Sequence, residues 1–199
     1  IYSTAKQKNI LIIGAGPSGM ESARLLAMHG HHVEIWEKDQ DIGGTARIAA
    51  LAYEPNGKLI KYLQNSLKEL GVKIKMNTLA TIENIESFKA DHVIVAVGAK
   101  RDAPPILGKE LNHVFDGEQL RGLLFGSDPL AIKKLSFFQQ FILKIGRASQ
   151  LLRNIKVLTM LSKIWMPISK NIIIIGGDLV GLELAEFLIE RGRKVTVLE

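Results

Sequence analysis

The residues that could do chemistry begin with a glycine-rich loop, Gly14-Ala15-Gly16-Pro17-Ser18-Gly19. In such a loop the first glycine permits a tight turn, the second lets the backbone approach a pyrophosphate, and the third lets a helix pack on a strand. The following helix N-terminus offers N–H groups and a partial positive charge to the anion. Glu37 follows at a spacing where its carboxylate can accept hydrogen bonds from a ribose. The pattern predicts a dinucleotide-binding loop, and the alternative is a glycine-rich turn without a ligand.

The same pattern occurs again near the end of the sequence. Residues 174–199 align without a gap to residues 12–37, each position being matched by one 162 residues later. Glu199 takes the place of Glu37, and the second loop is Gly176-Gly177-Asp178-Leu179-Val180-Gly181. Two such units suit an enzyme that passes a hydride from a nicotinamide dinucleotide to a flavin.

One position of the second loop departs from the pattern. Asp178 stands where the second glycine is expected, and it adds a negative charge where a pyrophosphate would approach. Two unit charges about 5 Å apart repel by roughly 1 kcal/mol in water and about 3 kcal/mol at an effective dielectric constant of 20. A carboxylate gains only about 0.3–1 kcal/mol from the helix dipole. Two interpretations stay open: a residue that weakens dinucleotide binding, or a helix cap that turns away from the ligand.

Strands and helices must position the first loop. Apolar runs and their spacing predict the elements in this order: a buried strand at 9–13, a helix at 17–29, a strand at 32–37, a helix at 57–71, a strand at 72–76 with a short hairpin strand at 78–82, and a buried strand at 91–99.

The second half of the chain is predicted to be mainly helical before the second unit. Residues 116–166 have helical spacing that is broken near Asp128 and near Gly146. The whole pattern predicts an α/β, Rossmann-like three-layer fold with a parallel sheet, truncated at its end. Its expected parts are a first dinucleotide-binding unit at 1–107, a basic helical connection at 108–168 and an incomplete second dinucleotide-binding unit at 169–199.

Composition bounds the class of protein. The chain has 199 residues, a formal net charge of +6 and no cysteine. Disulfides, thiolate catalysis and cysteine-ligated iron–sulfur clusters are therefore excluded within these residues, and a cytoplasmic protein is expected. The first ten residues are not expected to be a signal peptide, and no uncharged apolar run is long enough to span a bilayer. A first residue other than Met and a last residue inside a motif suggest a fragment.

Two further motifs accompany the first loop. A glycine doublet, Gly43-Gly44, follows Glu37, and the run Ile94-Val95-Ala96-Val97-Gly98-Ala99 has the form hhhATG except for Val97 in the place of threonine. These motifs resemble those of flavoprotein oxidoreductases with two dinucleotide-binding domains. The resemblance implies FAD in the first unit, with further contacts from Lys38, Gly43, Gly44, Thr45, Arg47, Ala80, Ala96 and Gly98.

The segment from Ala46 to Thr78 is similar to the C-terminal region of 2,4-dienoyl-CoA reductase, trimethylamine dehydrogenase and related old yellow enzyme-like flavoproteins. In that group a barrel bearing FMN and an iron–sulfur cluster precedes the two dinucleotide-binding domains. The resemblance implies NAD(P)H in the second unit, with Glu183 towards the nicotinamide and Glu199 favouring NADH. The cysteine pair that disulfide reductases carry after the glycine doublet is missing, which excludes dithiol chemistry.

Residues 129–170 contain cationic but no acidic side chains, interleaved with aromatic and aliphatic ones. One interpretation is an amphipathic surface that binds an anionic lipid or an acidic partner. The other, which we favour, is a helical connection that packs its apolar face on a neighbouring domain. Nucleic-acid binding is not predicted, because no recognised module is present. The histidines lack metal-ligand spacing, and no catalytic residue is assigned.

We therefore interpret the chain as part of an NAD(P)H- and FAD-dependent oxidoreductase that passes electrons to a separate FMN-type domain, which reduces an enoyl-type substrate. The chain alone is not expected to turn over. The rival hypothesis is a non-catalytic module that binds ADP or nothing and shapes an interface. Exposed strand edges also predict self-association into a homo-oligomer.

Overall fold

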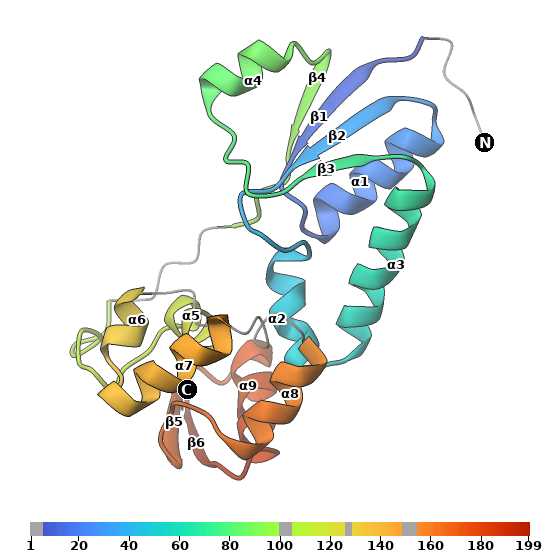
Figure 1. The fold of residues 1–199 in the computed structure, drawn as a ribbon. Coiled ribbons are helices and arrows are strands. Elements are labelled where there is room, and N and C mark those ends of the chain that lie inside the picture. Colours follow the sequence, from blue (N-terminus) through green and yellow to red (C-terminus); the bar gives the residue numbers. More distant parts are fainter. Residues whose placement is uncertain (1–5, 100–104, 126–128, 149–154) are drawn as a thin grey trace. The chain divides into compact units, whose positions relative to one another are not determined.

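The computed structural model describes residues 6–99, 105–125, 129–148 and 155–199. The chain divides into two compact units, residues 1–100 (unit 1) and 101–199 (unit 2). Each unit contains one copy of the repeated strand–helix–strand sequence (Figure 1). The finer division of the second half, with its boundary at 168, stays a prediction.

Unit 1 is built on a parallel sheet. Its strands are β1 (Asn9–Ile13), β2 (His32–Trp36), β3 (Lys73–Lys75) and β4 (His92–Val95), in the order β3-β2-β1-β4. Its helices are α1 (Pro17–Met28), α2 (Gly44–Ala52), α3 (Pro55–Glu69) and α4 (Ile82–Phe88). In Figure 1, α1 and α3 lie on one side of this sheet and α4 on the other.

Alternation along the strands decides which side chains enter the core of unit 1. Successive side chains of a strand point to opposite faces. On one face the apolar side chains of β1 and β2 pack with those of α1 and α3; the buried cluster consists of Ile10, Ile12, Ala15, Met20, Ala23, Ile35, Ile60, Leu63 and Leu67. Full burial of an aliphatic side chain of this size contributes about 1.5–3 kcal/mol. This cluster fixes α1, and with it the loop that precedes α1, against the sheet.

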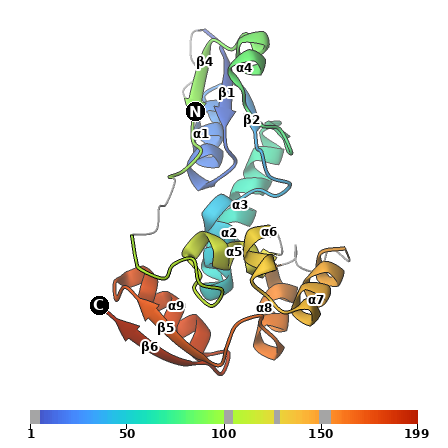
Figure 2. The same cartoon turned by 90° about the vertical axis from the view of Figure 1, so that its left-hand side faces the viewer.

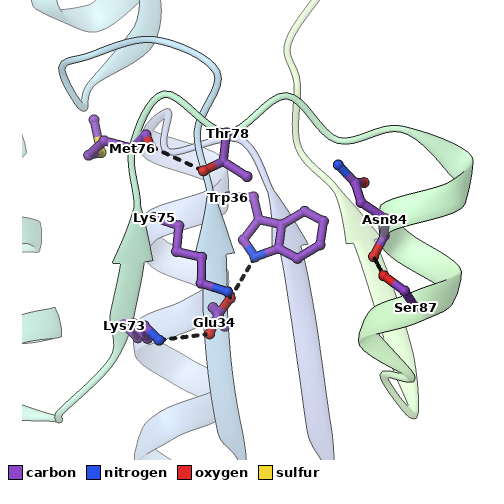
Figure 3. Close-up of polar contacts among 8 residues, drawn as sticks. All are labelled: Glu34, Trp36, Lys73, Lys75, Met76, Thr78, Asn84 and Ser87. Carbon is purple, nitrogen blue, oxygen red and sulfur yellow. Dashed lines mark hydrogen bonds and ion pairs between the residues drawn. The ribbon is translucent and has the colours of Figure 1, made fainter.

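The opposite face of the sheet carries a polar cluster on β2 and β3. Figure 3 shows Glu34 between Trp36 and two lysines of β3. The Trp36 indole N–H donates to Glu34 over 2.6 Å, and the ammonium of Lys75 lies 2.7 Å from the same carboxylate. Trp36 also packs edge-to-face on Phe88 of α4, with ring centroids 5.3 Å apart. Helix α4 thereby forms the third layer, and the predicted three-layer α/β fold is confirmed.

The hairpin strand predicted at 78–82 is wrong, because α4 begins there. The Thr81 hydroxyl accepts from the Asn84 N–H, and the Asn84 side chain accepts from the Thr81 N–H over 2.7 Å. This reciprocal pair is a capping box, which satisfies two donors at a helix start. Threonine followed three residues later by asparagine was the signal for this helix.

The strand predicted at 91–99 is shorter and less buried than expected. Its pairing with β1 ends at Val95. Strand β4 lies at the edge of the sheet, and the side chains of Val93 and Val95 are exposed because they point to the face that α1 does not cover. The apolar run alone did not distinguish an edge strand from a central one.

Among the described residues of unit 2, four helices precede its own strand–helix–strand unit. They are α5 (Gly117–Phe125), α6 (Pro129–Lys133), α7 (Phe137–Ala148) and α8 (Ile155–Ile164). The break predicted near Gly146 is placed two residues too early, because Gly146 lies inside α7, whose last residue is Ala148. A single glycine costs a helix only about 1 kcal/mol relative to alanine, so the helix tolerates it.

The end of unit 2 repeats the start of unit 1. Strand β5 (Asn171–Ile175) pairs in parallel with β6 (Lys194–Leu198), and α9 (Leu179–Ile189) connects them, as Figure 2 shows. The pairing register is also repeated, since Asn9 pairs with His32 and Asn171 with Lys194.

A buried arginine joins this repeat to the preceding helices. Arg191 is 4% exposed, and its guanidinium donates to the Ser162 hydroxyl of α8 over 2.9 Å and to the Phe187 carbonyl over 2.8 Å. The guanidinium also stacks 3.6 Å from the centroid of the Phe187 ring. Burial lowers the pKa of Arg191, which Glu190 partly opposes. Within the described ranges, no helix combines the length and apolarity needed to cross a membrane.

Candidate functional site

The first loop requires glycine at both of its ends. Gly14 has φ +105°, and a Cβ there would lie 2.5 Å from the Ala96 carbonyl oxygen. A Cβ on Gly19 would collide with the carbonyl oxygen of Gly14. The Gly14 N–H donates to the Trp36 carbonyl over 2.8 Å. The first and third glycines therefore have structural reasons to be present, whether or not a ligand binds.

The middle glycine has no such structural reason. Gly16 is the N-cap of α1 with φ −74° and ψ 175°, a conformation open to any residue. A Cβ on Gly16 would meet no atom of the described chain within 4 Å. The N–H groups of the first helical turn have no acceptor within the helix itself. Open space beside such groups is what an approaching anion needs.

The glycine doublet lies directly against the loop. The Gly43 N–H donates to the Ala15 carbonyl over 2.8 Å, and a Cβ on Gly44 would lie 3.4 Å from the Cα of Gly16. Thr45 is exposed at the start of α2, and Arg47 forms an ion pair with Asp41 at 3.0 Å. The structure thus brings together two segments that α1 and β2 separate in the sequence.

Glu37 has a role that the sequence analysis missed. Its side chain is 7% exposed and holds two backbone groups: the Ala15 N–H at 2.7 Å and the Asp39 N–H at 2.9 Å. The carboxylate therefore ties the loop to the end of β2. Each carboxylate oxygen has a further lone pair, so the expected ribose contact and the backbone contacts are compatible.

The other predicted FAD-side residues lie at the same edge of the sheet, where the strands of a parallel sheet end. The Ala96 N–H donates to the Ile13 carbonyl over 2.8 Å, and its methyl group lies beside Gly19. Gly98 lies two residues further along the chain than Ala96 and has φ +76°. Lys38 is exposed after Glu37, and Ala80 is half-buried between β3 and α4. The carboxyl end of a parallel sheet is where α/β folds bind ligands.

The second loop reproduces the backbone of the first. Gly176 has φ +115°, and its N–H donates to the Leu198 carbonyl over 2.8 Å, as that of Gly14 does to Trp36. A Cβ on Gly181 would collide with the Gly176 carbonyl oxygen. Both loops therefore have a first glycine with positive φ and a third glycine whose Cβ would collide with the carbonyl of the first, but only Gly14 is also crowded by a neighbouring strand end.

Asp178 caps helix α9. Its φ of −72° and ψ of −178° are close to those of Gly16, and its carboxylate accepts from the Gly181 N–H at 3.3 Å. The cap is thus present, and its effect on a ligand stays a prediction. A Cβ on Gly177 would lie 3.8 Å from the Cβ of Glu199. The remaining predicted residues of this loop are exposed: Leu179, Val180, Glu183 and Glu199.

Two family models match the chain. Residues 12–71 match the NAD(P)-binding Rossmann-like domain, and residues 79–199 match the pyridine nucleotide-disulphide oxidoreductase family. Together they span both repeated units. These residues contain no cysteine, so they do not supply the dithiol to which the name of the second model refers.

Several characterised proteins are similar over the whole chain. It is 33% identical to the bilirubin reductase of Mediterraneibacter gnavus, with all of this chain and 25% of that protein covered. It is 32% identical to the cinnamate reductase of Clostridium sporogenes, with 96% of this chain and 23% of that protein covered. The chain therefore spans about a quarter of the length of the curated relatives it matches. The predicted resemblance to 2,4-dienoyl-CoA reductase-like flavoproteins is confirmed.

Solved structures agree with this result. A complex of 2-naphthoyl-CoA reductase with 2-naphthoyl-CoA superposes with a TM-score of 0.71 at 28% identity, covering 99% of this chain and 24% of that one. Histamine dehydrogenase from Rhizobium sp. 4-9 superposes with a TM-score of 0.65 at 17% identity, covering all of this chain and 25% of that one. The second similarity supports the fold alone.

Proposed function

Since the chain belongs to the pyridine nucleotide-disulphide oxidoreductase family, we propose that it forms the dinucleotide-binding part of an NAD(P)H- and FAD-dependent oxidoreductase. The observation that carries this proposal is the open space beside Gly16. It is bordered by the N-terminus of α1 and by the glycine doublet, and it lies at the carboxyl end of a parallel sheet.

Unit 1 is proposed to hold the adenosine and pyrophosphate of FAD. The first-turn N–H groups of α1 would bind the pyrophosphate, and the oxygens of Glu37 would accept from ribose hydroxyls. Gly44 lies close enough to Gly16 to border the same ligand. The residues assigned to this site are Gly14, Ala15, Gly16, Pro17, Ser18, Gly19, Glu37, Lys38, Gly43, Gly44, Thr45, Arg47, Ala80, Ala96 and Gly98.

Unit 2 is proposed to hold NAD(P)H, with NADH favoured because Glu199 would repel a ribose phosphate and accept from a free hydroxyl. Its assigned residues are Gly176, Gly177, Asp178, Leu179, Val180, Gly181, Glu183 and Glu199. Bound NAD(P)H would supply a hydride and FAD would accept it. The residues of this chain bind and orient the two dinucleotides.

The onward acceptor is proposed to lie outside these residues, on a portion that carries FMN and an iron–sulfur cluster. The names of the relatives support a conjugated, enoyl-type substrate, since they include reductases of bilirubin, cinnamate and 2-naphthoyl-CoA. A cytoplasmic location and self-association through strand edges remain predictions. Sedimentation over a wide concentration range tests the second, and a strictly monomeric profile would contradict it.

Calorimetric titration of the full chain with FAD and with ADP, together with its visible absorbance, tests the assignment of unit 1. We expect binding of both and a yellow complex with FAD. Glu37→Gln keeps the side-chain volume but removes a charged acceptor, so we expect affinity for both ligands to fall about tenfold, since a hydrogen bond to a charged group contributes about 1.5–3 kcal/mol.

Glu199→Gln is the matched control, because it makes the same change at the corresponding position of unit 2. It should leave FAD affinity unchanged. Binding of ADP without FAD would favour the rival hypothesis of a structural nucleotide-binding module. Equal FAD affinity in the wild type and Glu37→Gln would show that the site assignment is wrong.

A further inference from the structure

The two loops differ at one position that matters for an anion. Gly16 and Asp178 occupy corresponding positions and have nearly the same backbone angles, with φ −74° and −72°. Neither residue needs to be glycine for the chain to fold. The presence of aspartate at this position of the second loop is therefore a chemical difference without a difference in backbone geometry.

The aspartate occupies the place that is open in the first loop. Beside Gly16, a Cβ would meet no described atom within 4 Å. In the second loop the side chain of Asp178 extends from that position, and its carboxylate accepts from the Gly181 N–H at 3.3 Å. This N–H belongs to the first turn of α9, whose donors would otherwise face a ligand anion.

The charges around the second loop add to this effect. Glu199 lies beside Gly177 and its side chain is exposed. The corresponding Glu37 of unit 1 is buried, and its carboxylate accepts hydrogen bonds from two backbone N–H groups. The first turn of α9 contains no basic residue. A dinucleotide that approaches the second loop therefore meets the Asp178 carboxylate, which already accepts a hydrogen bond from the Gly181 N–H of that loop.

We propose that Asp178 acts as an internal anion that competes with the pyrophosphate of NAD(P)H, so that the second loop binds its dinucleotide more weakly than the glycine pattern allows. This proposal rests on the proposed function of unit 2. It assigns Asp178 as an affinity-setting residue: the carboxylate must leave the Gly181 N–H before the pyrophosphate takes its place. Unit 2 thereby exchanges its dinucleotide readily, while unit 1, with Gly16, retains its own.

Titration of the full chain with NADH in three forms tests the proposal: wild type, Asp178→Asn and Asp178→Gly. Removing the competing charge should tighten NADH binding about tenfold in Asp178→Gly. Asp178→Asn keeps the shape and the capping oxygen but not the charge, so its affinity should lie between the other two. Glu186→Gln, on the same helix but away from the loop, changes net charge equally and should have no effect.

Inorganic pyrophosphate gives a readout that does not depend on the rest of the NADH site. It should raise the melting temperature of Asp178→Gly more than that of the wild type, because only the variant leaves the Gly181 N–H free for an anion. Equal shifts in the two proteins would overturn the proposal.

The outcomes separate this proposal from the function on which it rests. If the wild type and Asp178→Gly bind NADH equally well, the role of Asp178 is wrong and the NAD(P)H site stands. If neither form binds NADH but pyrophosphate distinguishes them, the competing carboxylate stands and the NAD(P)H assignment is wrong. The reciprocal variant Gly16→Asp should weaken FAD binding about tenfold by the same repulsion.

Discussion

The two strand–helix–strand units share a backbone but not an environment. Both pair their strands in the same register and close their loops with the same hydrogen bond. Strand β1, however, lies between β2 and β4, whereas β5 pairs with β6 alone among the described strands. Leu11 of β1 is fully buried, while the corresponding Ile173 of β5 is 66% exposed. Local sequence is thus enough for the turn, and neighbouring elements decide burial.

The largest difference is expected at the first glycine of each loop. Both Gly14 and Gly176 have a positive φ, which an L-residue adopts at a cost of about 1–2 kcal/mol. A Cβ on Gly14 would also collide with the Ala96 carbonyl, whereas one on Gly176 has open space among the described residues. Gly14→Ala should therefore lower the free energy of unfolding by about 3 kcal/mol and Gly176→Ala by about 1 kcal/mol.

Urea unfolding followed by tryptophan fluorescence measures these two changes separately. Trp36 reports on unit 1 and Trp165 on unit 2, so each variant can be made in a background with one tryptophan replaced by phenylalanine. Equal losses would show that β4 does not constrain the first loop.

A second difference lies after the helix of each unit. Arg191 of unit 2 corresponds to His29 of unit 1, which is exposed. Arg191→Ala removes the buried hydrogen bonds to Ser162 and to Phe187, and should lower the stability of unit 2 by about 2 kcal/mol. His29→Ala should change the free energy of unfolding of unit 1 by less than about 0.5 kcal/mol, as is usual for surface substitutions. Similar effects of both would contradict the anchoring role of Arg191.

The third difference concerns acid stability. Partial burial would raise the pKa of Glu34, but the hydrogen bonds from Lys75 and Trp36 outweigh it, so the pKa lies below its usual value of 4.5. The ionised Glu34 carboxylate therefore stabilises folded unit 1 above about pH 4.5, and this stabilisation is lost as the pH falls through the lowered pKa. Thr196 holds the corresponding place in unit 2 and has no carboxylate.

Glu34→Gln should destabilise unit 1 by about 1 kcal/mol at pH 7 and have little effect below the lowered pKa of Glu34. Urea midpoints measured from about pH 3 to pH 7 test this. A loss that stays constant across the whole range would mean that the carboxylate charge is not what stabilises the cluster in Figure 3.

The smallest effect is expected at the helix caps. Aspartate is a better N-cap than glycine by roughly 0.3 kcal/mol. Asp178→Gly should therefore lower the free energy of unfolding of unit 2 by that amount. Gly16→Asp should raise the free energy of unfolding of unit 1 by a similar amount and should weaken its binding of FAD. Thermal melting of both variants, compared with their ligand affinities, checks that stability and binding change in opposite directions.

Short-range patterns were enough to predict much of the fold and of the loops. The glycine spacing predicted both turns, and the strands at 9–13 and 32–37 were placed to within a residue, because tight turns and alternating apolar residues are local properties. Helix α4 was missed for a different reason: its capping pair, Thr81 and Asn84, is also local, but the alternating residues before it suggested a strand.

Contacts between distant segments were beyond such patterns. Nothing in the spacing of Glu37 shows that it holds the Ala15 N–H, since this depends on how β2 ends beside the loop. The hydrogen bond between Arg191 and Ser162 likewise depends on how the fold brings α8 close to the end of α9, 29 residues further along the chain. An arginine in a sequence normally predicts a solvated side chain, and only its acceptors in the fold make burial acceptable.

The hydrogen bond between Glu37 and Ala15 has a thermodynamic consequence for ligand entry. Restricting the backbone of one residue costs about 1–2 kcal/mol of conformational entropy. This bond and the hydrogen bond from the Gly43 N–H to Ala15 hold the loop in the folded chain. The conformational entropy of the loop is therefore lost when the chain folds and not when a ligand binds. A dinucleotide would then encounter a rigid cradle, and its association would release water without having to freeze the chain.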